Sequence, residues 1–449
     1  MSPSLTPLPP KLSTPIMTTP FVRISDLHAH DGAAVAVRGW VTHVRSSGKV
    51  AFVVLRDGSG ILQCVIVKTA VEPRVWDRYI ELTVETSVVL SGTVRADARA
   101  PGGYELSVTD LEVIGPSPID YPIQPKEHGV DFLMDHRHLW LRSSRQVAIL
   151  RVRNEIEQAI NDFFYARDFV RVDTPILTAA IGERSGLFST EYFDLGPAYL
   201  AQTGQLYGEA AAAALGRIYT FGPTFRAEKS KTRRHLAEFW MIEPEVAFND
   251  SNDNMRLQED LLSAIIERCV TRRGAELREL DRDTTKLERV KPPFPRINYS
   301  DAVRTLQQKG STIQWGDDLG AEDESLLVAD YDTPIFVVNY PKEAKAFYMK
   351  ENPDDPRTVL CDDCLAPEGY GEIIGGSQRE DNYEKLEARI REEGLPIASY
   401  GWYLDLRKYG TFVHSGFGLG LERTVAYICG LPHVRETVPF ARMMNRLTP

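Results

Sequence analysis

Residues 220–245 read TFGPTFRAEKSKTRRHLAEFWMIEPE, and this stretch decides the fold of the longer part of the chain. Its two ends have the composition of strands, and a basic polar loop separates them, so the stretch predicts a β-hairpin. Residues two apart in a strand point to the same side. We therefore expect Arg226 and Glu228 to face one site from this hairpin.

A second stretch, HSGFGLGLER at 414–423, has glycines that let a strand and a helix pack closely around a ligand. It ends in Arg423, and two arginines that face one pocket can grip a polyphosphate through charge-assisted, bidentate hydrogen bonds. The chain has no Walker sequence, and the G-x-G-x-G spacing is not a Rossmann fingerprint. Arg-x-Glu is common in strands and glycine-rich runs are often turns, so the prediction depends on the two stretches together.

Composition indicates a globular protein of at least two domains, because 449 residues exceed what one core usually supports. No apolar run approaches the roughly 18 residues that span a bilayer, and the first residues lack the apolar core of a secretory signal. Five cysteines form no disulfide framework; we expect reduced thiols in a cytoplasmic protein. Cys361 and Cys364 form a lone CxxC pair, so zinc is not expected. The net charge of −11 excludes indiscriminate attraction of the whole protein to nucleic acid. It does not exclude a local basic face that contacts phosphates.

The N-terminal part has a β pattern. Residues 1–20 are rich in Pro, Ser and Thr and are expected to form a disordered tail, in which Met17 is as good a start as Met1. Residues 21–118 contain five short strand patterns with turn signals and one helical stretch near 71–82. This set predicts an OB-type barrel, a fold that often presents one face to single-stranded nucleic acid. From this segment alone, a small barrel without a ligand remains the alternative.

A proline-containing linker is expected at 119–140, followed by a second domain at 141–449. Helical spacing of apolar residues from 143 to 169 leads into a short strand that ends near Pro175. Strands and helices then alternate irregularly, which is typical of an α+β fold. The charged helical region 251–290 is interpreted as a solvated surface insertion.

These stretches resemble a known family. FRAE and RHLAEFW are similar to motif 2 of the class II aminoacyl-tRNA synthetases, and GFGLGLER is similar to motif 3. The helix and strand that end at Pro175 resemble motif 1, the dimer-forming element. Residues 39–65 resemble the anticodon-binding barrel of the aspartyl, asparaginyl and lysyl subgroup. The likeness spans 21–449 and implies an antiparallel catalytic sheet, a homodimer, and ATP-dependent ligation of an amino acid to tRNA through an aminoacyl-adenylate, with release of AMP and pyrophosphate.

The resemblance also implies the residues that bind ATP. Arg226 would hold the α-phosphate and Arg423 the γ-phosphate, and both would act as catalytic cations. Glu228 would meet the edge of the adenine, and Phe239 would stack on its face. His235 would lie near the outer phosphates.

The stretch CDDCLAPEGYGEIIGGSQRE at 361–380 resembles the family strands that carry Mg²⁺ and the amino acid. By that likeness Asp363 and Glu372 would be the carboxylates near Mg²⁺, with Ser377 helping, and Glu372 would also contact ATP. Hard oxygen ligands shared with phosphates suit Mg²⁺.

The amino-acid substrate is predicted from QTGQLYGE at 202–209. Aspartyl enzymes have a stretch similar to QSPQLYKQ here, whose lysine grips the substrate carboxylate. In this chain that position is Gly208, and Glu209 follows. Glu209 would accept from the side-chain amide of asparagine while Arg379 donates to its carbonyl. Aspartate would face Glu209 with like charge, at a cost on the order of several kcal/mol in a dry site, so we expect L-asparagine and tRNA(Asn).

Other residues match the family position by position. Glu183 would take the α-ammonium of the amino acid, assisted by Gln205 and Glu243. In the barrel, three residues match those that stack on and bond the central uridine of the anticodon, in the way single-stranded bases are usually read: Arg45, Phe52 and Gln63. The alternative for the phenylalanine is an aromatic of the barrel core.

Three rival functions stay open. An aspartyl-tRNA synthetase, including one that charges both tRNAs, is opposed by the missing lysine. A tRNA-independent asparagine synthetase is opposed by the attached barrel. A catalytically silent RNA-binding paralogue is opposed by the intact set of charged residues, since a silent copy does not need them: Arg226, Glu228, Asp363, Glu372 and Arg423.

Overall fold

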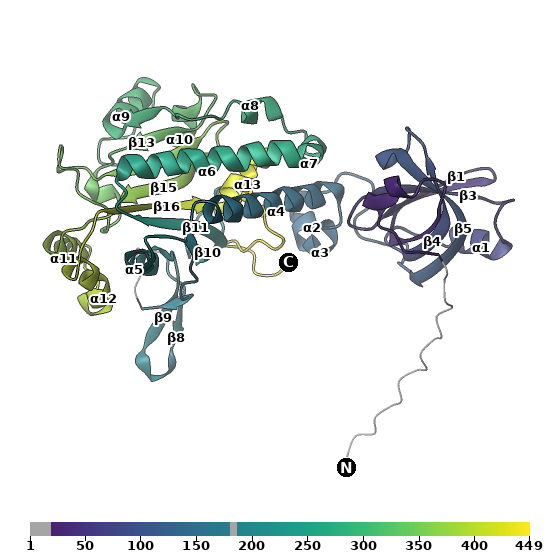
Figure 1. Ribbon diagram of the computed structural model, residues 1–449, viewed down its shortest axis with the longest axis horizontal. Helices are drawn as coiled ribbons and strands as arrows, with labels where there is room; N and C mark the ends of the chain where they lie inside the picture. Colours follow the sequence, from purple (N-terminus) through teal and green to yellow (C-terminus); the bar gives the residue numbers. More distant parts are fainter. Residues whose placement is uncertain (1–18, 180–185) are drawn as a thin grey trace, which may run out of the picture. The chain divides into compact units, whose positions relative to one another are not determined.

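The computed structural model describes residues 19–179 and 186–449. The described chain divides into two compact units, with the boundary between His128 and Gly129. Both units are drawn in Figure 1. The predicted tail, residues 1–20, lies almost wholly outside the described residues.

The smaller unit is a closed barrel of five strands in the order β1-β2-β3-β5-β4. Side chains of the strands alternate between the interior and the surface, as in β2, where Val53 and Leu55 are fully buried. This confirms the predicted OB-fold domain. The elements are β1 (Ala34–Ser47), β2 (Val50–Arg56), β3 (Ile61–Val67), α1 (Pro73–Ile80), β4 (Ser87–Ala96) and β5 (Tyr104–Gly115), with 3-10 turns η1 (Ile24–Ala29) and η2 (Pro101–Gly103).

Residues 130–140 were expected to be linker, but they form two short helices, α2 (Val130–Asp135) and α3 (Arg137–Trp140). Arg137 is fully buried, and its guanidinium donates to the carbonyl oxygens of Pro439 and Val438, each at 2.8 Å. A buried cation with such partners is tied to the C-terminal segment. These helices therefore belong to the larger unit.

The larger unit is built on an eight-stranded sheet in the order β12-β13-β14-β15-β16-β11-β10-β6. Neighbouring strands are antiparallel except for the outermost pair at each edge, β12 with β13 and β10 with β6. This confirms the predicted α+β fold on an antiparallel sheet. The strands are β6 (Val170–Arg171), β10 (Arg217–Phe225), β11 (Glu238–Ala247), β12 (Arg296–Asn298), β13 (Ile335–Val338), β14 (Cys361–Ala366), β15 (Gly371–Gln378) and β16 (His414–Gly420).

A smaller three-stranded sheet, in the order β7-β9-β8, belongs to the same unit. Its strands and the helices of the unit have the following bounds: β7 (Leu177–Thr178), β8 (Ser189–Glu191), η3 (Phe193–Leu195), β9 (Pro197–Leu200), α4 (Ser144–Tyr165), α5 (Gln205–Leu215), α6 (Ser251–Arg272), α7 (Gly274–Glu279), α8 (Thr284–Glu288), α9 (Tyr299–Gln308), α10 (Ala321–Val328), η4 (Lys342–Ala344), α11 (Tyr383–Glu392), α12 (Ile397–Lys408), α13 (Leu421–Cys429) and η5 (Val434–Glu436).

Helix α6 shows that the interpretation of 251–290 as a solvated insertion was wrong. Its residues Leu261, Leu262 and Ile265 are fully buried, and the helix packs along α4 and against the sheet (Figure 1). In the sequence, the many charged residues made it hard to recognise the apolar residues that recur with the period of a helix. Some of those charges also hold the two helices together: Glu155 of α4 accepts from Arg268 at 2.6 Å.

No helix in the described part of the chain is both long and apolar enough to cross a membrane. All five cysteines are described, and all are buried and unpaired with one another. The absence of a disulfide framework agrees with the sequence.

Candidate active site

The hairpin predicted at 220–245 is present as β10 and β11, which pair antiparallel from Arg217–Val246 to Phe225–Glu238. The first strand ends at Phe225, so Arg226 and Glu228 lie in the loop rather than in the strand. The backbone N–H of Arg226 still donates to the carbonyl of Ala237 at 3.0 Å. The hairpin therefore fixes the start of the loop, and both predicted side chains reach one cleft.

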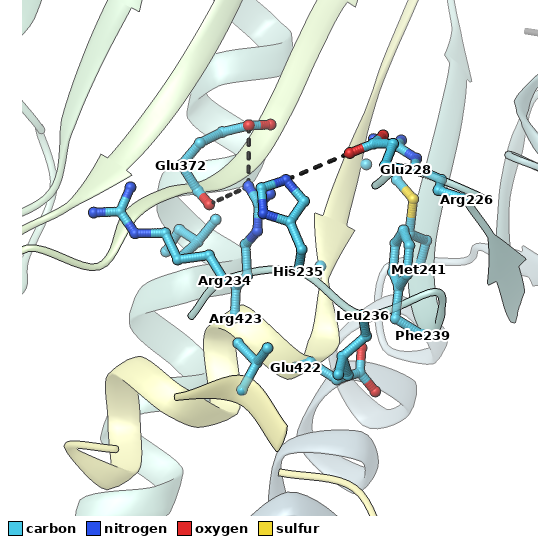
Figure 2. A pocket seen from close by; sticks show the side chains of 14 residues that line it. Arg226, Glu228, Arg234, His235, Leu236, Phe239, Met241, Glu372, Glu422 and Arg423 are labelled. Atoms are coloured by element: carbon cyan, nitrogen blue, oxygen red, sulfur yellow. Dashed lines mark hydrogen bonds and ion pairs between the residues drawn. The ribbon is translucent and has the colours of Figure 1, made fainter. Parts of the chain in front are cut away.

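All six residues predicted to bind ATP line this cleft, which opens between the β10–β11 hairpin, β15, β16 and the start of α13. Figure 2 shows their side chains converging from these elements. The six are Arg226, Glu228, His235, Phe239, Glu372 and Arg423. Arg234, Met241 and Glu422 also line it.

Arg423 lies in the first turn of α13, and its Nη1 donates to the carbonyl oxygen of Glu372 at 2.9 Å and to its Oε2 at 3.1 Å (Figure 2). Burial opposes ionisation of Glu372, but Arg423 and then Lys345 hold its pKa below the usual value. Glu372 is therefore an anion, and its partner arginine is oriented across the cleft.

Arg226, the second arginine predicted to bind phosphate, has a buried donor without a partner in the described part of the chain. Its guanidinium carbon lies 5.5 Å from the centre of the Phe239 ring. Its Nε is buried and has no hydrogen-bond partner among the described residues. A buried donor without a partner is costly, so this group is suited to receive an anionic oxygen of a ligand beside an aromatic face.

His235 sits between the loop and the cleft. Its Nε2 is 3.5 Å from Oε2 of Glu228, and its Nδ1 is 3.2 Å from the hydroxyl of Ser230. Burial, and then the nearby Arg423, lower the pKa of His235 from 6.5. The ring is therefore mainly neutral at pH 7 and serves as a hydrogen-bonding group rather than as a fixed charge.

Two carboxylates converge over Gly375 on β15. A Cβ at that position would lie 2.9 Å from Oε1 of Glu372 and 3.5 Å from Oδ1 of Asp363, so glycine leaves the space in which they meet. Asp363 pairs with Gly375, whereas Glu372 pairs with Leu365 across a register shift. Such a bulge re-aims side chains, and here it brings Glu372 to the side of Asp363.

The charge at this point is partly compensated by Lys345, whose Nζ lies 2.8 Å from Oδ2 of Asp363. Burial raises the pKa of Asp363 to about 6, although Lys345 opposes the rise. Two carboxylates that meet over Gly375, one of which lines the cleft, are oxygen donors of the kind that Mg²⁺ prefers. The residues present therefore fit the metal that the family likeness implies.

Three of the five residues predicted to bind the amino acid, Gln205, Glu209 and Arg379, lie in a second, buried cluster. Glu209 of α5 has a fully buried side chain. Its Oε1 accepts from Gln205 at 3.1 Å and from the Tyr403 hydroxyl at 2.7 Å, and its Oε2 accepts from Arg407 at 2.6 Å. Nε2 of His414 lies 3.0 Å from the same Oε2. Burial opposes ionisation, but Arg407 and then His414 hold the pKa of Glu209 well below its usual value.

This arrangement corrects one detail of the prediction for Glu209. A carboxylate offers about four acceptor positions, and four protein groups already occupy them. A substrate amide can therefore reach Glu209 only by replacing one of them, and the longest of these contacts is that of Gln205.

Arg379 is also paired within the protein. Its Nε donates to Oε2 of Glu245 at 3.2 Å, its Nη2 donates to Oε1 of the same residue, and its Nη1 donates to the Ser377 hydroxyl at 2.7 Å. Both Arg379 and Glu245 are almost fully buried. The hydroxyl of Ser377 is thus directed at the arginine of the amino-acid cluster rather than at the two carboxylates proposed for Mg²⁺.

Glu243 lies next to the start of α5, at the residue that precedes Gln205. Its Oε2 accepts from the backbone N–H of Gly204 at 2.8 Å and from the Thr220 hydroxyl at 3.0 Å. It borders a separate hollow beside Thr174 and Pro175. Glu183, predicted to bind the α-ammonium, lies outside the described residues.

Several residues of the amino-acid cluster were missed from the sequence. Glu245 ends the quoted hairpin stretch and His414 begins the quoted glycine-rich stretch, so both were visible without an assigned role. Tyr403 and Arg407 lie on α12, 194 and 198 residues from Glu209, in a stretch with no recognisable motif. Only the fold brings them together.

The three residues predicted to read the anticodon meet on neighbouring strands of the barrel. Arg45 of β1 pairs with Phe52 of β2 in the ladder, and its guanidinium carbon lies 4.3 Å from the centre of that ring. Its Nη2 donates to Oε1 of Gln63 on β3 at 3.3 Å. Phe52 is only half-buried and does not belong to the barrel core, which argues against the alternative role as a core aromatic.

Comparisons with known proteins agree with both units. Residues 129–444 match the family described as tRNA synthetases class II (D, K and N), and residues 35–114 match the OB-fold nucleic acid binding domain. Asparagine–tRNA ligase from Chloroflexus aurantiacus is 55% identical over 96% of this chain and 99% of its own length.

Solved structures give the same result. Asparaginyl-tRNA synthetase from Pyrococcus horikoshii, complexed with asparaginyl-adenylate, superposes with a TM-score of 0.93 at 45% identity and covers 95% of this chain and 99% of its own. The Entamoeba histolytica asparaginyl-tRNA synthetase, also in complex with asparaginyl-adenylate, gives 0.87 at 33% identity, with 97% and 100% covered. The chain therefore belongs to the asparagine–tRNA ligases, within the class II tRNA synthetases.

Proposed function

We propose that this chain ligates asparagine to tRNA(Asn) at the expense of ATP, through an asparaginyl-adenylate, with release of AMP and pyrophosphate. The observation that carries the choice of amino acid is the buried and ionised carboxylate of Glu209. The residue before it is Gly208, at the position where aspartyl enzymes carry the lysine of a stretch similar to QSPQLYKQ. The relatives named asparagine–tRNA ligase support the same choice.

Adenylate formation needs no side-chain nucleophile. The carboxylate oxygen of asparagine attacks the α-phosphorus in line, the bond to the bridging oxygen breaks, and pyrophosphate leaves with that bond's electron pair. Arg226, whose Nε has no protein partner among the described residues, holds the α-phosphate. Arg423 holds the γ-phosphate and neutralises its charge, and Phe239 stacks on the adenine. Positioning and charge neutralisation are the chief contributions of these side chains.

The adenine edge contacts Glu228, and neutral His235 donates its ring N–H to an oxygen of the outer phosphates. In the second step the 3′-hydroxyl of the terminal tRNA adenosine attacks the carbonyl carbon of the adenylate. The ester bond forms as the bond to AMP breaks, and AMP leaves. The hydroxyl proton goes to solvent or to the departing phosphate.

Asp363 and Glu372 would hold Mg²⁺, because their carboxylates meet over Gly375. When bound, the ion would neutralise phosphate charge. Ser377 contributes indirectly, through its hydrogen bond with Arg379. Mg²⁺ and ATP are thus the expected cofactor and co-substrate.

Asparagine is selected by its side-chain amide, whose carbonyl oxygen accepts from Arg379 and whose NH₂ donates to Glu209. In this arrangement Gln205 leaves Glu209 and its carbonyl accepts from the α-ammonium, alongside Glu183. Glu243, which accepts from the backbone N–H of Gly204 directly before Gln205, assists in holding the α-ammonium.

Residues 21–118 form the proposed anticodon-binding domain, in which Arg45, Phe52 and Gln63 read the central uridine. The catalytic domain begins at Gly129, because α2 and α3 belong to the larger unit. The segment from 143 to Pro175 is the proposed dimer contact of a homodimer. Since ATP and tRNA are the substrates, the cytoplasm is the proposed site of action.

A charging assay tests this function. Purified protein, ATP, Mg²⁺ and radiolabelled asparagine or, in a parallel reaction, radiolabelled aspartate are incubated with transcripts of tRNA(Asn) and, as the matched control, tRNA(Asp). We expect asparaginylation of tRNA(Asn) alone. Transfer of aspartate to either transcript at a comparable rate would instead support the aspartyl or dual-specificity rival, and no charging with intact transcripts would support the silent paralogue.

A further inference from the structure

We propose that the outer face of β1 and β2 binds the tRNA strand beyond the anticodon triplet, with the exposed ring of Trp40 as the surface on which a flanking base stacks. This adds a second base-binding position to the one formed by Arg45, Phe52 and Gln63. Because the central uridine is taken to lie at those three residues, the second position depends on the proposed function.

Trp40 lies on the same face of the barrel as the residues predicted to read the uridine. Where β1 pairs with β2, Trp40 is opposite Arg56, and Arg45 is opposite Phe52. A register shift between the two pairs offsets the odd spacing from Trp40 to Arg45, so both side chains point outwards and are exposed. Phe52 and Arg56 are an even number of residues apart on β2 and share that face. The two aromatic rings therefore belong to one continuous surface.

An arginine lies against each of these rings. The guanidinium carbon of Arg56 is 5.2 Å from the centre of the Trp40 ring, and Arg45 lies over Phe52 in the same way. Arg56 is held there by an ion pair with Glu85, whose side chain is only 8% exposed. Trp40 is 41% exposed. A ring with a fixed arginine on one side keeps its exposed surface available for stacking on a base.

A third aromatic–arginine pair extends this face. The guanidinium carbon of Arg38 is 3.4 Å from the centre of the Phe21 ring, which is 46% exposed. The ring is fixed beside β1, because Phe21 forms a bridge with Ala36 and the N–H of Val22 donates to the carbonyl oxygen of Ala36 at 2.9 Å. Arg38 is exposed and lies two residues before Trp40. Its guanidinium can therefore meet a phosphate next to the base on Trp40.

The charge of this face is complementary to RNA. Strands β1, β2 and β3 contain three arginines and no aspartate or glutamate, in a chain whose net charge is −11. Aromatic rings interleaved with cations are typical of surfaces that bind single-stranded nucleic acid. The occupant is therefore the RNA strand that carries the uridine, rather than a protein.

The spacing along β2 places the base on Trp40 outside the triplet. Phe52 and Arg56 are four residues apart, a separation of about 14 Å at about 3.4 Å per residue. Stacked bases lie only about 3.4 Å apart along a strand. The central uridine has one anticodon neighbour on each side, so a base at Trp40 belongs to a nucleotide that flanks the triplet.

The test measures the affinity of the full chain for a fluorescent stem–loop RNA with the anticodon loop of tRNA(Asn), by anisotropy. Trp40→Ala should weaken binding by roughly 5- to 100-fold, the loss expected for one stacked base. Trp40→Phe keeps a ring on which a base can stack and should stay within about threefold of wild type. Trp315→Ala is the matched control, because Trp315 of the larger unit is also 41% exposed and lies under Arg357 at 5.1 Å. It should change the affinity by less than about twofold.

Stem–loops with one abasic nucleotide locate the base that Trp40 contacts. Removing one flanking base should reduce the Trp40→Ala loss to less than about threefold, whereas removing a triplet base should leave that loss undiminished. A loss that persists with every flanking abasic nucleotide, or that disappears when a triplet base is removed, would overturn the flanking site. An equal loss in Trp40→Phe would do the same.

Two outcomes separate this site from the proposed function. Wild-type affinity in Trp40→Ala, with weakened binding in Phe52→Ala, would overturn the flanking site and leave the proposed function intact. A wild-type chain that neither binds the stem–loop nor charges tRNA(Asn) would overturn the proposed function, and the flanking site with it.

Discussion

Replacing Glu209 with glutamine removes one negative charge from the buried amino-acid cluster and keeps the shape of the side chain. In the wild-type chain, Oε2 of Glu209 accepts from Arg407 at 2.6 Å and lies 3.0 Å from Nε2 of His414. Its Oε1 accepts from the Tyr403 hydroxyl at 2.7 Å. Glutamine has a single acceptor oxygen, so its NH₂ group must face one of these donor pairs. The substitution therefore disrupts the group that is proposed to bind the substrate amide.

The size of the effect follows from that contact. A hydrogen bond to a charged partner contributes about 1.5–3 kcal/mol, which corresponds to a rise of roughly 10- to 150-fold in KM for asparagine. Arg407, left without its counter-ion in a buried position, destabilises the fold by about 3 kcal/mol or more. It also becomes a free cation for the carboxylate of aspartate, so the preference for asparagine over aspartate should fall at least about tenfold.

The assay is ATP–pyrophosphate exchange with asparagine, aspartate and ATP varied in turn, together with urea unfolding. Glu392→Gln, at an exposed position of α11, is the control for loss of a carboxylate. KM for ATP should change little, since Glu209 does not line the cleft of Arg226 and Arg423. An asparagine KM within threefold of wild type, with unchanged preference over aspartate, would refute the role of Glu209.

Three further predictions concern other parts of the molecule. Arg226→Ala should lower the rate of pyrophosphate exchange by about 100- to 1,000-fold, because a preorganised cation at the α-phosphate is lost; tRNA binding, measured by filter retention, should stay within about twofold, and near-normal exchange would contradict the assignment. Phe52→Ala should weaken binding of an anticodon stem-loop by roughly 5- to 100-fold, since stacking on one base contributes about 1–3 kcal/mol; unchanged affinity would remove this ring from the RNA site. Burial, and then Arg435, lower the pKa of His433 to about 4, so the unfolded chain binds the proton first as pH falls and stability drops between about pH 6.5 and 4. His433→Asn keeps an acceptor for the backbone N–H of Arg435. Its urea midpoint should fall less than that of the wild type between about pH 6.5 and 4; equal falls in the two proteins would contradict the role of His433.

Much of the fold followed from local patterns. Alternating apolar residues and turn signals predicted the barrel, and the hairpin and glycine-rich stretch predicted a shared cleft, because strong local patterns survive in the tertiary structure. Helix α6 was misjudged because its buried Leu261 and Ile265 stand among many charges. Whether such a helix is packed or solvated depends on what lies against it, and the sequence does not show that.

The site was predicted in part for the same reason. Arg226, Glu228 and Arg423 belong to compact motifs, and they meet in the cleft as expected. Tyr403 and Arg407 belong to no motif, and their contact with Glu209 depends on the packing of α12. The bulge that brings Glu372 beside Asp363 likewise depends on strand register, which a single sequence does not specify.

The most direct test of the central claim is ATP–pyrophosphate exchange by the purified wild-type chain, without tRNA, in parallel reactions with asparagine, aspartate and lysine. The buried, ionised Glu209 predicts exchange with asparagine and none above background with the other two. Exchange mainly with aspartate would leave the fold and the adenylate chemistry in place but would contradict the selection of asparagine by Gly208 and Glu209.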